Sequence, residues 1–171
     1  MYSCPDQPPP VLVSAFGPKA ADVAARIGDG FVSTKPDKEL LDRYRGHGGT
    51  GPSTAGVKIC WGPDREEAAK LAHRLWRSSG VPGELSQDLR SPALFEQAAQ
   101  LVTVDAIADK LPCGPDPGPI VEAVKEYVDA GFDRVYVNQI GPDQEQFFKF
   151  FTAELAPALA DIDVVARRSD A

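Results

Sequence analysis

Short apolar segments alternate along the chain with longer segments in which apolar residues recur at helical spacing. The strand-like segments are residues 11–16, 30–34, 55–61 and 134–139. The helix-like segments are residues 18–27, 37–45, 63–79, 114–131 and 142–159. Because short turns join these segments, we expect parallel strands with right-handed crossovers, and therefore an α/β fold.

Two residues mark the start and the end of the first helix. Pro18 suits a first helical position, where its missing N–H would be unpaired in any case, and Gly28 predicts the helix end. The ten residues before the first strand contain four prolines, so we expect residues 1–10 to form an extended lead. Residues 11–160 are predicted to form one domain, and residues 161–171 a flexible tail.

The pattern changes between residues 79 and 111. Two short helices are predicted there, one opened by a Ser91 cap and one by a Thr103 cap. We interpret this region as an insertion between repeating strand and helix units. The GPDP sequence at residues 114–117 is then expected to set the turn before the next helix.

Composition narrows the kind of partner. The chain has 171 residues and a net charge of −7, with its basic residues dispersed, so binding to nucleic acid or to anionic lipid is not expected. Its apolar runs are far shorter than the roughly 20 residues that span a bilayer. A small-molecule partner and a cytoplasmic location are expected, with no membrane contact.

Cysteine and histidine offer little catalytic or metal chemistry. Cys4, Cys60 and Cys113 are far apart in sequence and form no CxxC pair, so they are interpreted as reduced, partly buried thiols, and no metal site is predicted. His73 lies beside an apolar helix stripe, which favours a packing role. His47 lies in a Gly-rich loop without an adjacent acid, so it is not taken as a base.

The strand ends favour a barrel over an open nucleotide-binding sheet. No GxGxxG follows any strand, and small or polar residues follow the strand ends, as on the catalytic face of a TIM barrel. A complete barrel needs eight strands and about 250 residues. Four strands therefore predict a (β/α) half-barrel.

Several stretches resemble one family jointly. PPPVLVSAFGPKAADVAARIGDGFVST, VKICWGPDREEAAKLAHRLW and YVDAGFDRVYVNQIGPDQEQFF are similar to bacterial luciferase-like oxidoreductases, in the branch related to coenzyme F420-dependent glucose-6-phosphate dehydrogenase. The resemblance implies strands five to eight of a TIM barrel, with a helical insertion after strand seven. The amino-terminal half of the barrel is expected to be absent.

The same resemblance implies a cofactor. Coenzyme F420, a deazaflavin, is expected, with FMN as the alternative, and hydride passes between it and an organic substrate. Ser14, Ala15, Phe16, Gly17 and Pro18 match the family segment along the cofactor. A tight turn without a ligand is the competing interpretation. Phe16 departs from the family, in which a smaller residue is commoner.

The resemblance also implies a substrate site. Thr34, Lys35 and Lys110 match positions near the phosphate pocket of the related dehydrogenase, although Lys110 replaces an arginine and Ser86 a basic residue. Lysine offers a point charge in place of a two-pronged donor, so glucose 6-phosphate is not expected. Surface solvation is the alternative for both lysines.

The chain itself is predicted to hold no catalytic residue, because the family's His, Trp and Glu at the hydride-transfer centre lie in the other half. Three functions stay open: a split or truncated oxidoreductase, a non-catalytic self-associating remnant, and a ligand-binding half-barrel. All three predict a homodimer or a complementing amino-terminal half-barrel chain, because exposed strand edges are rarely left bare.

Overall fold

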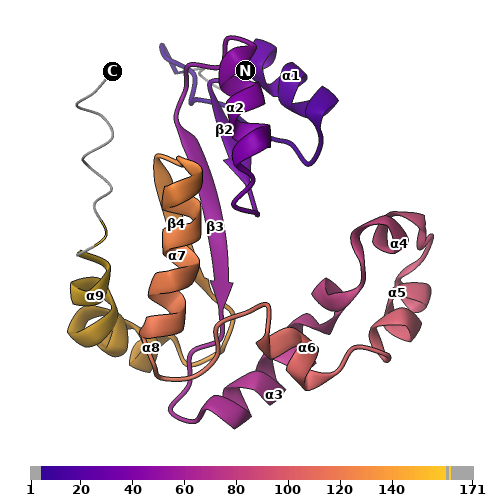
Figure 1. Cartoon of the computed structure of the whole chain (residues 1–171), viewed down its shortest axis with the longest axis vertical. Coiled ribbons are helices and arrows are strands. Elements are labelled where there is room, and N and C mark those ends of the chain that lie inside the picture. Colours follow the sequence, from indigo (N-terminus) through magenta and orange to yellow (C-terminus); the bar gives the residue numbers. More distant parts are fainter. Residues whose placement is uncertain (1–4, 161, 163–171) are drawn as a thin grey trace. The chain divides into compact units, whose positions relative to one another are not determined.

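A computed structural model describes residues 5–160 and 162. Its strands are β1 (Leu12–Ser14), β2 (Gly30–Ser33), β3 (Ser53–Ile59) and β4 (Arg134–Gln139), which form a sheet in the order β1-β2-β3-β4 (Figure 1). Strands β1 and β2 are parallel, as are β2 and β3. Asp133 N–H donates to Ser53 O and Ile140 N–H donates to Ile59 O, so β4 runs the same way as β3. The parallel α/β architecture predicted from the sequence is confirmed.

Helices connect the strands, and a helical insertion follows β3. The helices are α1 (Pro18–Ile27), α2 (Lys38–Gly46), α3 (Arg65–Trp76), the 3-10 turn η1 (Arg77–Gly80), α4 (Gly83–Asp88), α5 (Pro92–Ala99), α6 (Val104–Ala108), α7 (Gly118–Ala130), α8 (Gln144–Phe150), the π turn η2 (Phe151–Leu155) and α9 (Ala156–Ala160). The predicted caps are present: Ser91 accepts from Leu94 N–H and Thr103 from Ala106 N–H. These hydroxyls satisfy amides that the first helical turn leaves unpaired.

The described residues divide into two compact units. The first unit contains residues 5–57 and 124–136, and the second contains residues 58–123, 137–160 and 162. The prediction of one domain over residues 11–160 stays a prediction, as does the flexible tail, because residues 161 and 163–171 lie outside the described part. Residues 5–10 contain neither helix nor strand.

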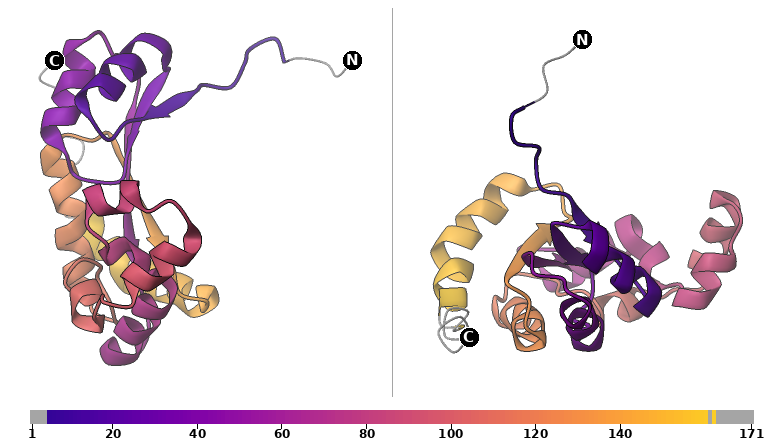
Figure 2. Two further views of the ribbon diagram at one scale, coloured as in Figure 1. Left: turned by 90° about the vertical axis from the view of Figure 1, so that its right-hand side faces the viewer. Right: turned by 90° about the horizontal axis from the view of Figure 1, so that it is seen from above.

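Aromatic packing forms the core of the first unit. Phe31 on β2 stacks on Tyr44 of α2, with ring centroids 4.9 Å apart, and lies 6.4 Å from the ring of Phe132. Helix α1 contacts β1, β2 and α2 (Figure 2). Its buried side chains are Ala21 and Ala24, and such small residues permit close approach of a helix to a sheet.

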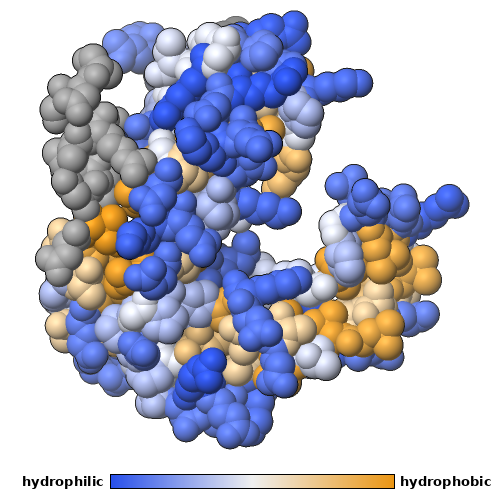
Figure 3. Space-filling model, viewed as in Figure 1, coloured by the Kyte–Doolittle hydropathy of each residue, from blue (hydrophilic) through white to orange (hydrophobic). Residues whose placement is uncertain are grey.

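The second unit has a separate small core. Cys60, Ala72, Ile107 and Leu111 are buried together, so helices α3 and α6 pack on the segment that follows β3. Further along the insertion the surface is apolar over α4 and α5 (Figure 3), where Leu85 and Leu94 are exposed. Gln139 fixes the segment after β3, since its side chain accepts from Trp61 N–H at 2.8 Å and donates to Trp61 O at 3.1 Å.

The structure differs from the sequence prediction at several element ends. Strand β1 is shorter than residues 11–16, and β3 begins and ends two residues earlier than the predicted segment 55–61. Ser53 is paired because Asp133 accepts both its N–H and its hydroxyl, at 2.8 and 2.9 Å. The last helix is interrupted by the π turn at Phe151–Leu155.

Candidate functional site

The turn between β1 and α1 places the five residues predicted to contact a cofactor. Ala15 is buried and anchors the turn, whereas the Phe16 side chain is 72% exposed. Gly17 is the N-cap residue of α1, in extended backbone, and Pro18 occupies the first turn as predicted. Ser14 is exposed at the end of β1. The turn therefore presents Ser14 and Phe16 on the surface, beside the start of a helix.

The N-terminus of α1 lacks the side-chain cap that two later helices have. No side chain accepts a hydrogen bond there, and its first turn contains no acidic residue. Helices α2 and α3 are capped by Asp37 and Asp64. A Cβ added at Gly17 would meet no atom within 4 Å. Open space beside uncapped amides at the positive end of a helix fits an anionic group.

Helix α2 holds α1 in place. Arg43 donates through Nε and its Nη2 to the Asp22 carboxylate at 2.6 and 2.8 Å, and Nε also donates to Pro18 O at 3.2 Å. The hydrogen bond from Arg43 lowers the pKa of the Asp22 carboxyl, more than partial desolvation raises it. The two-pronged pair with Asp22 and the bond to Pro18 O together hold α1 against α2.

Thr34 and Lys35 follow the adjacent strand. The Ser33 hydroxyl donates to Lys35 O at 2.9 Å and accepts from Lys35 N–H at 3.2 Å, so this short turn is locally fixed. Both Thr34 and Lys35 are exposed. Ser14 lies opposite Val32 in the parallel register. This turn and the β1–α1 turn therefore both start at the carboxyl ends of their strands, on the same side of the sheet. The first unit thus brings Thr34 and Lys35 together with the predicted cofactor turn.

Lys110 belongs to the second unit. It lies just after α6, where its N–H donates to Ile107 O at 3.0 Å and its side chain is exposed. Its predicted substrate role has no support from a contact in that unit. The structure groups it with the insertion and not with the turns after β1 and β2.

The two histidines differ in outcome. His73 Nε2 lies 2.8 Å from Val102 O, which agrees with the predicted packing role. No acid adjoins His47 in the sequence, but the fold brings one near it: His47 caps the end of α2, and its Nδ1 lies 3.6 Å from Asp22 Oδ1. The acid lies on α1, which packs against α2, so the contact joins residues that are distant in the sequence. Because Asp22 is already bound by Arg43, His47 still lacks the partner of a general base.

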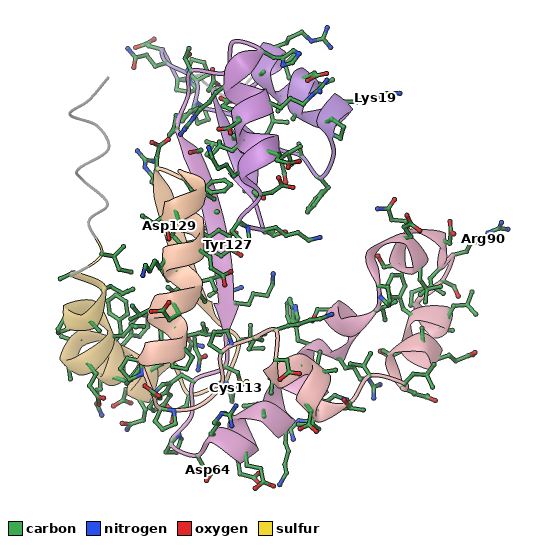
Figure 4. All side chains as sticks on the ribbon, in the orientation of Figure 1. Lys19, Asp64, Arg90, Cys113, Tyr127 and Asp129 are labelled. Atoms are coloured by element: carbon green, nitrogen blue, oxygen red, sulfur yellow. The ribbon has the colours of Figure 1, made fainter. Side chains whose placement is uncertain are left out.

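Tyr127 is a residue of the site that the sequence did not predict. Its hydroxyl has one proton, which it shares between Thr34 O at 3.1 Å and Gly56 O at 3.2 Å. It lies on α7 (Figure 4) and supports the turn that contains Thr34 from below the surface. Burial raises the pKa of this phenol, and the neighbouring Glu126 and Tyr136 raise it further. Its position among the apolar residues of a helix predicts that it is buried. Nothing in the sequence predicts its hydrogen bonds.

Comparison with known proteins identifies the family. Residues 2–134 match the model of the luciferase-like monooxygenase family. The chain belongs to this family. It is 31% identical over 172 residues to the F420-dependent glucose-6-phosphate dehydrogenase of Mycobacterium tuberculosis, covering 93% of this chain and 51% of that protein. The enzyme of the same name from Gordonia bronchialis is 29% identical, covering 96% and 52%.

Solved structures show the same fold. An F420-dependent secondary alcohol dehydrogenase, solved with an F420–acetone adduct, superposes with a TM-score of 0.71 at 24% identity, covering 92% of this chain and 51% of that one. The coenzyme F420-dependent tetrahydromethanopterin reductase of Methanopyrus kandleri gives 0.62 at 20% identity, covering 88% and 51%. These likenesses confirm the predicted half-barrel fold class. The chain spans about half the length of the curated relatives it matches.

None of the helices among the described residues is long and apolar enough to cross a membrane. Within that same part of the chain, no group of three or more His, Cys, Asp or Glu side chains could hold a metal ion.

Proposed function

We propose that this chain supplies the carboxy-terminal half of the barrel of an F420-dependent oxidoreductase, which transfers a hydride between the deazaflavin and an organic substrate. The observation that supports this most is the uncapped N-terminus of α1 beside the open space at Gly17, in a chain of the luciferase-like family. The curated relatives named above are F420-dependent dehydrogenases. F420 is therefore favoured over FMN.

The residues of the turn fit an anionic cofactor group. The first-turn amides of α1, with no side-chain acceptor, donate to a phosphate, while Gly17 leaves room for it to approach the backbone. Arg43 keeps α1 in position through Asp22 and Pro18. The bound deazaflavin supplies the hydride chemistry, and the protein supplies binding and orientation.

Substrate is proposed to bind next to this turn. Thr34 provides a hydroxyl and Lys35 a positive charge just after the carboxyl end of β2. Barrel enzymes place their active sites at the carboxyl ends of their strands. The substrate role of Lys110 stays a prediction of the family resemblance. Tyr127 holds the backbone of Thr34, so it acts as a positioning residue and not as a catalytic one.

The rest of the barrel is proposed to complete the site. Strand β4 lies at one end of the sheet order and β1 at the other, and both present an edge that a further strand can pair. We propose that a second copy or an amino-terminal half-barrel covers these edges and, in the second case, brings the acid and base groups. Sedimentation tests this: an assembled species supports it, and a folded 18.3 kDa monomer overturns it.

Fluorescence titration tests the cofactor proposal. Increasing amounts of chain are added to coenzyme F420 and, separately, to FMN, with albumin as the control protein. Saturable quenching of F420 at lower protein concentration than for FMN is expected. Equal or tighter binding of FMN would contradict the assignment of F420 as the cofactor. Quenching that does not saturate with either compound would show that the chain binds neither.

A further inference from the structure

We propose that Cys60 and Cys113 are an oxidation site: a thiol pair that closes to an intramolecular disulfide in the presence of a peroxide oxidant. The two residues are far apart in sequence, and the fold brings them opposite each other. Both are free thiols in the structure, Cys60 buried and Cys113 half-buried.

Backbone pairing sets the geometry of the pair. Cys60 and Cys113 form an isolated parallel β-bridge, in which Cys60 N–H donates to Pro112 O at 2.9 Å and Gly114 N–H donates to Cys60 O at 3.1 Å. Paired strands lie about 4.8 Å apart. Disulfide-linked residues usually have Cα atoms about 4.4 to 6.8 Å apart, so this bridge has a permitted spacing.

The side chains share one environment. Cys60 belongs to the buried cluster with Ala72, Ile107 and Leu111, and Cys113 packs against the same cluster. The Cys113 thiol donates to Leu111 O at 3.2 Å, so it must leave this weak bond and rotate to reach Cys60. Figure 4 shows Cys113 in the segment before α7. Since Cys113 is the less buried of the two, it is the thiol that an oxidant meets first.

The reaction balances with hydrogen peroxide as the oxidant. The Cys113 thiolate attacks one peroxide oxygen, the O–O bond breaks, and a sulfenic acid and one water result after proton transfer. The Cys60 thiolate then attacks the Cys113 sulfur, forming the S–S bond and releasing the second water. Together the two thiols lose two electrons and two protons, and peroxide is reduced to two waters.

Burial makes this reaction slow at neutral pH. Desolvation raises the pKa of Cys60 to about 11, and the negative charge of an ionised Cys113 adds to the shift. Burial also raises the pKa of Cys113, against an opposing contribution from Arg65. Because only thiolates react, the rate of disulfide formation should increase about tenfold per pH unit between pH 7 and 8.5. Activated sensor cysteines, with lowered pKa values, show no such increase.

The disulfide would bind the end of β3 to the segment before α7. It closes residues 60–113, with helices α3, η1, α4, α5 and α6, into a covalent loop. Such a loop reduces the freedom of the unfolded chain, so the oxidised protein should unfold at a higher temperature than the reduced one.

Mass spectrometry and thermal unfolding test the proposal in a Cys4→Ser background, which leaves Cys60 and Cys113 as the only cysteines. After peroxide treatment at pH 8.5, we expect a linked peptide containing both residues, a higher unfolding temperature, and reversal of both by dithiothreitol. The matched variant Cys113→Ser, at a half-buried position, should show neither change.

Other products decide against the proposal. Sulfinic acid on Cys113 without a linked peptide, or a disulfide between two chains, overturns it. An intramolecular disulfide whose formation rate does not change with pH overturns the role assigned to the buried thiolates. These outcomes leave the cofactor proposal untouched, because Cys60 and Cys113 are not among the residues proposed to contact coenzyme F420.

Discussion

The hydroxyl of Tyr127 lies 3.1 Å from the carbonyl oxygen of Thr34 and donates a hydrogen bond to it. The same hydroxyl lies 3.2 Å from Gly56 O, so one phenol on α7 links the residue after β2 to the middle of β3. A residue proposed to face substrate is thereby fixed through its backbone, while its side chain stays free to bind.

Removing this hydroxyl tests its contribution to stability. Tyr127→Phe should lower the free energy of unfolding by about 1 to 2 kcal/mol, because two carbonyl groups lose a buried donor. Urea denaturation measures the change. Tyr136→Phe is the control, since that side chain is 46% exposed and its loss of a hydroxyl should have little effect. Equal midpoints for Tyr127→Phe and the unmodified chain would show that water replaces the phenol at no cost.

Alkaline pH gives a second test of the same group. Burial holds the pKa of Tyr127 above its ordinary value, so the folded state favours the neutral phenol. Its contribution to stability is complete below about pH 10, the unfolded value, and is lost as pH rises through the folded pKa. Between pH 9.5 and 11.5 the unmodified chain should lose stability more steeply than Tyr127→Phe. Parallel curves from circular dichroism melts would contradict this.

Close backbone contact explains Gly51 and predicts a large mutational effect. A Cβ at this position would lie 1.9 Å from Asp29 O and 2.8 Å from Gly30 Cα, so backbone atoms must move. Gly51→Ala should cost about 2 kcal/mol or more. Gly46→Ala is the matched control, because a Cβ there meets no atom within 4 Å and the residue ends a helix. Thermal unfolding compares them, and similar melting temperatures would refute the proposed clash.

Local signals allowed some elements to be predicted closely. Pro18 and Gly28 mark the ends of α1 as observed, and β4 has the predicted bounds Arg134–Gln139. The sequence could not reveal the π turn at Phe151–Leu155, because its apolar spacing also fits a regular helix. The pairing of Ser53 with Asp133 was missed because it depends on a contact distant in sequence.

The candidate site was only partly predictable, for the same reason. The β1–α1 turn follows from local sequence and family resemblance, whereas the supports of the site come from other elements. Arg43 reaches Asp22 and Pro18 from α2, and Tyr127 reaches Thr34 from α7. Cys60 and Cys113 were interpreted as reduced, partly buried thiols far apart in sequence, and the strand pairing places them together.

Phe16 should limit cofactor affinity. Its ring adds bulk to the proposed cofactor turn, where the family resemblance implies a smaller residue, so Phe16→Ser should tighten F420 binding severalfold. Stability should change little, because the side chain is 72% exposed. Fluorescence titration measures the affinity and a thermal melt checks the fold. Weaker binding by a normally folded variant would mean that the ring contacts the cofactor favourably.

The most direct test of the central claim compares F420 affinity in Gly17→Val and Gly83→Val. Both glycines lie at helix starts, and a Cβ at either position would meet no atom within 4 Å, so both variants should fold normally. Gly17→Val fills the space beside the uncapped amides of α1 and should weaken F420 binding at least about tenfold, a loss of about 1.4 kcal/mol. Gly83→Val should bind as the unmodified chain does. If Gly17→Val, with an unchanged melting temperature, binds F420 as tightly as Gly83→Val, the β1–α1 turn is not the cofactor site.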